Sequence, residues 1–301
     1  MNHAVVLGAS GFLGSWVARE LESRKIGVVT VGRASPESAR LDIEADILDL
    51  DLVEICNEAE ADVIFDLAGT GDVPRSLREP AVDLHANVAT TVAVLDAARR
   101  AAHPPRVVLV SSAAVYGESV AMPMGEDHPL VPISPYGVSK LAAEHYLRVF
   151  HRLYGLGGLA VRPFSVYGPG QRKLVVYDLL RRILDGEDPL LISAPADVTR
   201  DFVYVEDVAA AIVALARAAP AEAEAYNLAS GRPTSLRELA DALLQATGSA
   251  ASAVFVSDQV PGNPNHWYGD PSKAASLGVT LDTALVRGLA ETASWVVDGS
   301  K

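Results

Sequence analysis

Cysteine is nearly absent from this chain of 301 residues: Cys56 is the only one, so no internal disulfide can form. Such scarcity is typical of a reducing compartment, and we expect a cytoplasmic protein. Cys56 itself lies in an acidic, helix-like stretch, where we expect a packed small side chain and no nucleophile.

Excess positive charge is also lacking. Lysine and arginine number 25 against 38 aspartates and glutamates, which gives a net charge of −13, and no basic block occurs. Nucleic acid is therefore not an expected partner. No apolar run approaches the ~20 residues of a membrane span, and the N-terminus enters a predicted strand at Ala4 without a charged leader. Neither a membrane partner nor a signal peptide is expected. The seven histidines are scattered, without metal-ligand spacing, so no metal site is predicted.

Half of the residues are hydrophobic, enough for a substantial core. Short apolar runs alternate with helix-length amphipathic stretches, a pattern that predicts an α/β fold with a doubly wound parallel sheet of the Rossmann type. The predicted strands are residues 4–7, 27–31, 41–45, 63–67, 106–111 and 159–162. The predicted helices are residues 12–24, 50–60, 80–102 and 136–154.

After Arg162 the texture becomes rich in turns and less regular. This change predicts a second, smaller, mixed α/β lobe that binds substrate. We assign residues 1–163 with 201–228 to the dinucleotide-binding domain and residues 164–200 with 229–301 to the substrate-binding lobe.

A glycine-rich turn follows the first predicted strand and opens the first helix. Its G-x-x-G-x-x-G spacing lets the backbone turn tightly and leaves the helix N-terminus free to face a pyrophosphate. In this strand–turn–helix context the motif predicts dinucleotide binding. The residues concerned are Gly8, Ser10, Gly11, Phe12, Leu13 and Gly14.

The end of the second predicted strand bears on the choice between NAD and NADP. An NAD site typically has an acidic residue here for the ribose hydroxyls, whereas this chain offers Arg33 and Ser35, which suit a 2′-phosphate. NADP(H) is therefore favoured, with NAD(H) as the alternative. Farther on, Asp46 and Ile47 are predicted to hold the adenine, although Asp46 could equally cap a helix.

Three residues are predicted to carry the chemistry. Ser112 follows the fifth predicted strand, whose carboxyl end should point into the cleft. Tyr136 and Lys140 are four residues apart on a predicted helix and therefore share one face. An ammonium group near a phenol favours the phenolate, so we expect Lys140 to lower the pKa of Tyr136. No GxSxG elbow surrounds Ser112, which argues against a hydrolase.

Together with further motifs, these residues resemble the extended short-chain dehydrogenases/reductases, in the nucleotide-sugar epimerase/dehydratase group. The motifs are Asn87-Val88 and the runs at residues 162–170, 200–207, 226–231 and 269–273. The resemblance implies that Tyr136 exchanges a proton with a sugar oxygen, that Lys140 binds the nicotinamide ribose, and that Ser112 orients the sugar. It also implies a nucleotide-diphosphate sugar as substrate and a homodimer formed through the helices at 80–102 and 136–154.

The resemblance extends the predicted site. Arg200 is expected to bind the diphosphate, a role that suits its planar fork of donors. The full predicted substrate set is Ser112, Ser165, Gln171, Arg200 and His266. The cofactor set further includes Leu67, Ala68, Gly69, Asn87, Ser111, Tyr136, Lys140 and Pro163.

Departures from the group narrow the reaction. Sugar 4,6-dehydratases carry acids where this chain has Ala113 and Ala114, so dehydration is not expected. Many epimerases have Asn at Ser165 and His at Asp66, for which no role is assigned. Because Arg33 favours NADPH, we predict a 4-ketoreductase of NDP-4-keto-6-deoxyhexoses. The alternatives are an NAD-dependent nucleotide-sugar 4-epimerase and a non-catalytic NADP-binding sensor.

Overall fold

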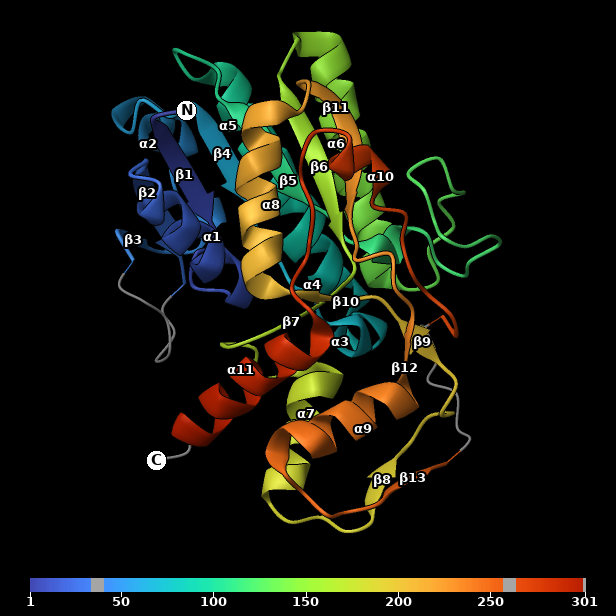
Figure 1. Cartoon of the computed structure of the whole chain (residues 1–301). Helices are drawn as coiled ribbons and strands as arrows, with labels where there is room; N and C mark the ends of the chain where they lie inside the picture. The colour runs from blue at the N-terminus through green and yellow to red at the C-terminus, as the bar shows by residue number, and fades with distance from the viewer. Residues whose placement is uncertain (34–40, 257–263, 300–301) are drawn as a thin grey trace.

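A sheet of seven parallel strands lies at the centre of the computed structural model, which describes residues 1–33, 41–256 and 264–299 (Figure 1). The strand order is β11-β6-β5-β4-β1-β2-β3, with the crossover of a doubly wound fold between β1 and β4. The strands are β1 (His3–Leu7), β2 (Gly27–Gly32), β3 (Ile43–Glu44), β4 (Val63–Asp66), β5 (Arg106–Val110), β6 (Gly158–Pro163) and β11 (Glu222–Leu228). The predicted fold class is confirmed.

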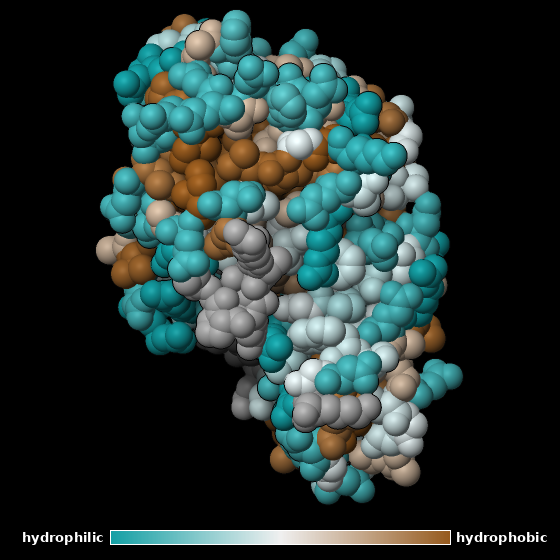
Figure 2. Space-filling view, turned by 90° about the vertical axis from the view of Figure 1, so that its left-hand side faces the viewer, coloured by the Kyte–Doolittle hydropathy of each residue, from teal (hydrophilic) through white to brown (hydrophobic). Residues whose placement is uncertain are grey.

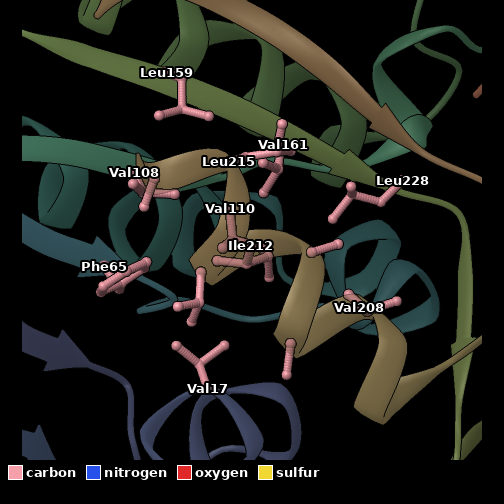
Figure 3. Close-up of a cluster of buried hydrophobic side chains, with 14 of the residues drawn as sticks. Val17, Phe65, Val108, Val110, Leu159, Val161, Val208, Ile212, Leu215 and Leu228 are labelled. Carbon is pink, nitrogen blue, oxygen red and sulfur yellow. The ribbon is translucent and has the colours of Figure 1, made fainter. Parts of the chain in front are cut away.

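Helices cover both faces of this sheet. On one face α1 (Phe12–Ser23) and α8 (Val205–Ala218) pack against the strands, and Figure 3 shows Val17, Phe65, Val108 and Ile212 meeting in that layer. On the other face lie α2 (Leu52–Glu58), α5 (Thr90–Arg100) and α6 (Pro135–Tyr154). Because both faces are buried, the central strands are almost continuously apolar, which is why they could be recognised in the sequence.

Two strands differ from the sequence-based expectation. The predicted strand at 41–45 is reduced to Ile43–Glu44, because the Asp42 carboxylate instead accepts hydrogen bonds from the Thr30 backbone and hydroxyl at 2.8 and 2.7 Å. Strand β11, at the edge of the sheet, was not predicted. Its first residues alternate exposed Glu222 and Glu224 with buried alanines, which is the pattern of a half-exposed edge strand.

The single helix predicted at 80–102 is divided. It consists of α4 (Pro80–Leu84), a π-helical segment η2 (His85–Ala89) and α5. A short α3 (Val73–Arg78) precedes it, and short 3-10 turns, η1 (Ile47–Asp49) and η3 (Ala113–Val115), follow β3 and β5. The π segment contains Asn87, and such segments are frequent at functional sites.

A smaller lobe lies beyond the carboxyl ends of the strands (Figure 1). Its helices α7 (Leu174–Leu184), α9 (Leu236–Thr247) and α11 (Leu285–Asp298) share one apolar cluster. Its short strand pairs are β7 (Ser165–Tyr167) with β10 (Phe202–Tyr204), β8 (Leu190–Ile192) with β13 (Ala253–Phe255), and β9 (Thr199–Arg200) with β12 (Thr234–Ser235). A short α10 (Ser272–Ala275) packs near β11. The residue boundaries assigned to the two domains stay a prediction.

Asp201 anchors the segments that connect the two parts. Its buried carboxylate accepts hydrogen bonds from the backbones of Ser230, Gly231 and Gly269 and from the Ser230 hydroxyl, at 2.6 to 3.2 Å. Four donors on one buried carboxylate satisfy it without a cation. The segments after β11 and before α10 are thereby fixed beside β9.

The surface is largely polar on the side of β2 and β3. Figure 2 shows this face as mostly hydrophilic, with an apolar band across its upper half. None of the helices in the described ranges is long and apolar enough to cross a membrane.

Candidate active site

A cavity of about 1630 Å³ separates the carboxyl edge of the sheet from the smaller lobe. Among the described residues that line it, eight side chains are basic and two, Asp72 and Asp178, are acidic. This balance is opposite to that of the whole chain, in which acids predominate. The cavity therefore favours anionic ligands. The basic residues are Arg19, Arg33, Arg75, Lys140, Arg172, Lys173, Arg182 and Arg200.

Most of the predicted site residues meet in this cavity. Those that line it are Gly8, Ser10, Gly11, Phe12, Leu13, Gly14, Arg33, Leu67, Ala68, Gly69, Ser111, Ser112, Tyr136, Lys140, Pro163, Ser165, Gln171 and Arg200. Asp46, Ile47, Asn87 and His266 are not among the lining residues in the described part of the chain. Ser35 lies outside the described residues.

The glycine-rich turn has the geometry that a pyrophosphate needs. A Cβ atom at Gly14 would lie 2.1 Å from the Gly8 carbonyl oxygen, and Gly8 itself has a φ of +80° beside the Leu67 carbonyl. Only glycine fits such contacts. Helix α1 begins without a side-chain cap and without an acid in its first turn, so its first N–H groups face the cavity unpaired by side chains. The chain thus fits the diphosphate of a dinucleotide there.

The predicted adenine and ribose contacts are less well supported. Arg33 is exposed at the lip of the cavity. The Asp46 carboxylate accepts a hydrogen bond from the backbone of Leu48 at 3.1 Å and so caps η1, which is the second of its two predicted roles. Ile47 is buried in the core beside α2.

Asn87 shapes the cavity from behind. Its Oδ1 accepts a hydrogen bond from the Thr70 backbone at 3.2 Å, and its Nδ2 donates to the Asp83 carboxylate at 3.1 Å. Gly69 has a φ of +114°, and a Cβ there would lie 2.3 Å from Asn87 Oδ1. The buried amide of Asn87 thus supports the loop at 69–71, and its direct contact with a cofactor stays a prediction.

Tyr136 is set against Ser112 by the packing of helix α6 on η3. Ser134 caps this helix by accepting a hydrogen bond from the Gly137 backbone at 3.2 Å, and a Cβ at Gly137 would lie 2.5 Å from the Ala114 carbonyl oxygen. The helix can therefore approach η3 closely. Ser112 accepts a hydrogen bond from the Ala114 backbone at 3.1 Å and also hydrogen-bonds to Tyr136.

The expected effect of Lys140 on Tyr136 is wrong for this structure. Burial raises the pKa of Tyr136 to about 12; the hydrogen bond to Ser112 lowers this pKa and the charge of Asp83 raises it further. The Lys140 ammonium donates a hydrogen bond to the Val110 carbonyl oxygen at 3.0 Å. Burial lowers the pKa of Lys140, whereas the charges of Asp66, Asp83 and Glu144 raise it. The ammonium is thus directed toward acids and a carbonyl.

Glu144, which the sequence did not single out, locks helix α6 to the strand ends. Its buried carboxylate accepts hydrogen bonds from the Ser111 hydroxyl at 2.6 Å and from Arg162 at 2.7 and 2.9 Å, and Arg148 adds a third ion-pair contact at 3.0 Å. The Ser111 hydroxyl therefore serves the fold here. The sequence feature that could have indicated this network is Arg162, a charged residue in the otherwise apolar strand β6.

Arg200 presents a cation to the cavity without an ion-pair contact to any acid among the described residues. Its Nη1 donates to the carbonyls of Thr199 and Asn265 at 2.8 and 3.4 Å, and none of the ion pairs within the described residues involves it. Burial lowers its pKa to about 10, against a smaller opposing effect of Glu118. A desolvated arginine of this kind suits a phosphate ligand.

Gln171 and His266, two other predicted substrate contacts, both have polar contacts within the protein. The Gln171 amide nitrogen donates to the Val166 carbonyl at 2.8 Å, so the buried side chain shapes the cavity wall. His266 is exposed and its ring lies 3.4 Å from the Thr199 hydroxyl, outside the cavity lining. No cluster of metal-ligating side chains occurs within the described ranges.

Comparison with known proteins assigns the chain to a family. The model of the NAD dependent epimerase/dehydratase family matches residues 4–229. The chain belongs to this family. A UDP-glucose 4-epimerase of Mycolicibacterium smegmatis is 34% identical over 96% of each chain. The structure of UDP-glucose 4-epimerase from Thermotoga maritima with UDP-glucose superposes with a TM-score of 0.90, at 29% identity over 99% of each chain.

The structure of MoeE5 in complex with UDP-glucose and NAD is also similar to this chain. It superposes with a TM-score of 0.90, at 32% identity over 99% of this chain and 100% of that one. These relatives favour the epimerase alternative over the ketoreductase that the sequence reading preferred, and they give no support to its preference for NADP. Both preferences rested mainly on Arg33, which is exposed at the opening of the cavity.

Proposed function

We propose that this protein is an NAD-dependent 4-epimerase of a UDP-hexose. The observation that carries the proposal is that the glycine-rich turn, Ser112, Tyr136 and Arg200 all line one cavity. This arrangement suits a dinucleotide and a nucleotide sugar that meet at the tyrosine hydroxyl. The similar structures named above, one solved with UDP-glucose and the other with UDP-glucose and NAD, support the same assignment.

In this proposal the residues of the chain bind the cofactor and the sugar nucleotide, orient the sugar, and move one proton. Tyr136 accepts the proton of the sugar C4 hydroxyl and later returns it, and Ser112 orients that hydroxyl by a hydrogen bond. Lys140 holds the ribose next to the nicotinamide, Arg200 holds the diphosphate, and Ser165 contacts the sugar. Bound NAD would supply a hydride acceptor, and then donor, at C4. Ala114 lines the cavity and Ala113 is buried beside it, and neither can act as the acid or base of a dehydration.

The test begins with the protein as purified. It should release NAD on denaturation and interconvert UDP-glucose and UDP-galactose with no cofactor added, which can be followed by proton NMR. Consumption of added NADPH with a 4-keto-6-deoxyhexose nucleotide, in the absence of interconversion, would replace the epimerase with the reductase. Binding of NAD without turnover of any UDP-sugar would favour the non-catalytic sensor.

We also propose a homodimer formed through helices α4 and α6. Apolar side chains are exposed along one stripe of α6 and on α4, in a pattern that a monomer would leave facing water. They are Val82, Leu84, Val138, Tyr146, Val149 and Leu153, exposed by 42 to 64%. Sedimentation equilibrium should give twice the chain mass, and Val149→Glu with Leu153→Glu should give the monomer. A monomeric parent protein would refute the dimer.

A further inference from the structure

A second acid lies buried behind the proposed catalytic pair. Asp83, on α4, is 2% exposed. Its Oδ1 accepts a hydrogen bond from Asn87 at 3.1 Å, whereas its Oδ2 is buried without a hydrogen-bond partner within the described residues. An unpaired buried carboxylate oxygen destabilises the fold, so stability does not explain its presence.

The other acids near the pair are compensated. On β4, Asp66 accepts hydrogen bonds from the Ala68 backbone and the Thr91 hydroxyl at 3.2 and 3.0 Å. On α6, Glu144 is neutralised by two arginines. The groups that β5 and the residues after it direct at Tyr136 and Lys140 are neutral: the Val110 carbonyl and the Ser112 hydroxyl. Of these three acids, Asp83 is therefore the one that keeps a buried oxygen without a hydrogen-bond partner among the described residues.

Two hydrogen bonds also lead from Asp83 to the loop that faces the Tyr136 hydroxyl. Asp83 holds the amide of Asn87, and Asn87 holds the Thr70 backbone at 3.2 Å. The next residue, Gly71, lines the cavity, and a Cβ there would lie 3.9 Å from the Tyr136 hydroxyl. The loop that faces Tyr136 is thus fixed from Asp83.

We propose that Asp83 is a positioning residue of the active site, which fixes the loop at 69–71 through Asn87 and places its carboxylate behind Tyr136. Electrostatic repulsion between this carboxylate and a phenolate opposes ionisation of Tyr136, since the charge of Asp83 raises the pKa of Tyr136. This inference rests on the proposed role of Tyr136, but its test needs no substrate.

The charge effect is measured by titrating tyrosine absorbance in the full-length protein with NAD added. The signal of Tyr136 is the difference between each protein and the same protein carrying Tyr136→Phe. Asp83→Asn removes the charge and keeps an oxygen for Asn87, so the Tyr136 midpoint should fall by about one pH unit, a tenfold change in proton affinity. Asp83→Glu should leave the midpoint near that of the parent.

The matched control is Asp96→Asn, on α5, where a half-buried acid pairs with Arg99 and Arg100. A midpoint in Asp83→Asn that moves no more than in this control, or that rises, would overturn the charge effect. If Asp83→Asn does not fold, Asp83→Ser must show the same downward shift, because its hydroxyl is neutral and can still accept from Asn87.

The positioning effect has its own measurement, hydrogen exchange at the Thr70 amide. Asp83→Ala should increase the exchange rate roughly five- to tenfold, the equivalent of one lost hydrogen bond, whereas Asp83→Asn should leave it unchanged. Equal rates in both variants would overturn this part. The titration and exchange results stand whether or not a UDP-sugar is turned over, so failure here is distinguishable from failure of the epimerase assignment.

Discussion

The two sides of the cavity recognise anionic groups by different means. On the sheet side the site is made of backbone: Gly8 and Gly14 allow contacts that a Cβ would block, and the start of α1 offers free N–H groups. On the lobe side it is made of side chains, with Arg200 desolvated and held by carbonyls. A backbone site is fixed by local geometry, whereas a side-chain site depends on segments brought together by the fold.

The largest expected effect lies between the two sides. Tyr136→Phe removes the hydroxyl that exchanges the proton, so kcat should fall by about 10²- to 10⁴-fold. Binding of NAD and of UDP-glucose, measured by calorimetry, should stay near that of the parent protein. An activity within fivefold of the parent would exclude Tyr136 as the acid–base group.

The sheet side should fail selectively in Gly14→Ala. The added Cβ would lie 2.1 Å from the Gly8 carbonyl oxygen, so the turn must shift. Overpacking of this kind costs up to about 3 kcal/mol, and we expect NAD affinity to fall by about 100-fold. Binding of UDP, which occupies the lobe side, should change little. If both ligands weaken equally, the two sides are not independent.

On the lobe side, Arg200→Ala should weaken binding of the UDP-sugar and leave binding of NAD unchanged. Losing charge-assisted hydrogen bonds worth about 2 kcal/mol should raise KM for the UDP-sugar by about 30-fold, with NAD affinity unchanged. Arg287→Ala, which removes an exposed arginine of α11 paired with Glu291, is the matched control and should behave like the parent. An unchanged KM in Arg200→Ala would remove Arg200 from the substrate site.

The smallest effect is expected at Arg33. Because its side chain is exposed at the lip of the cavity, Arg33→Ala should change the affinity for NAD by less than about threefold. The affinity for NADP, measured in parallel by fluorescence of the reduced forms, should remain below that for NAD in both proteins. If the parent protein prefers NADP and Arg33→Ala loses that preference, the NADP preference predicted from the sequence would be correct.

The difference between local backbone sites and sites assembled by the fold also explains which site residues could be predicted from the sequence. The turn at Gly8–Gly14 and the spacing of Tyr136 and Lys140 are local patterns, and the structure brings both to the cavity. Asp83 and Glu144 were not predicted, since acidic residues on helices normally indicate a solvated face, and only tertiary packing buries them. The same packing directs the Lys140 ammonium to the Val110 carbonyl, and burial raises the pKa of Tyr136 instead of the lowering expected from Lys140.

The most direct test of the epimerase assignment follows one hydride. UDP-glucose carrying deuterium at C4 is incubated with the purified protein, with no cofactor added, and the product is examined by NMR and mass spectrometry. The proposal predicts UDP-galactose that retains deuterium at C4, because the hydride leaves and returns within one active site. Loss of the label, or no UDP-galactose while added NADPH is consumed with a 4-keto sugar nucleotide, would contradict it.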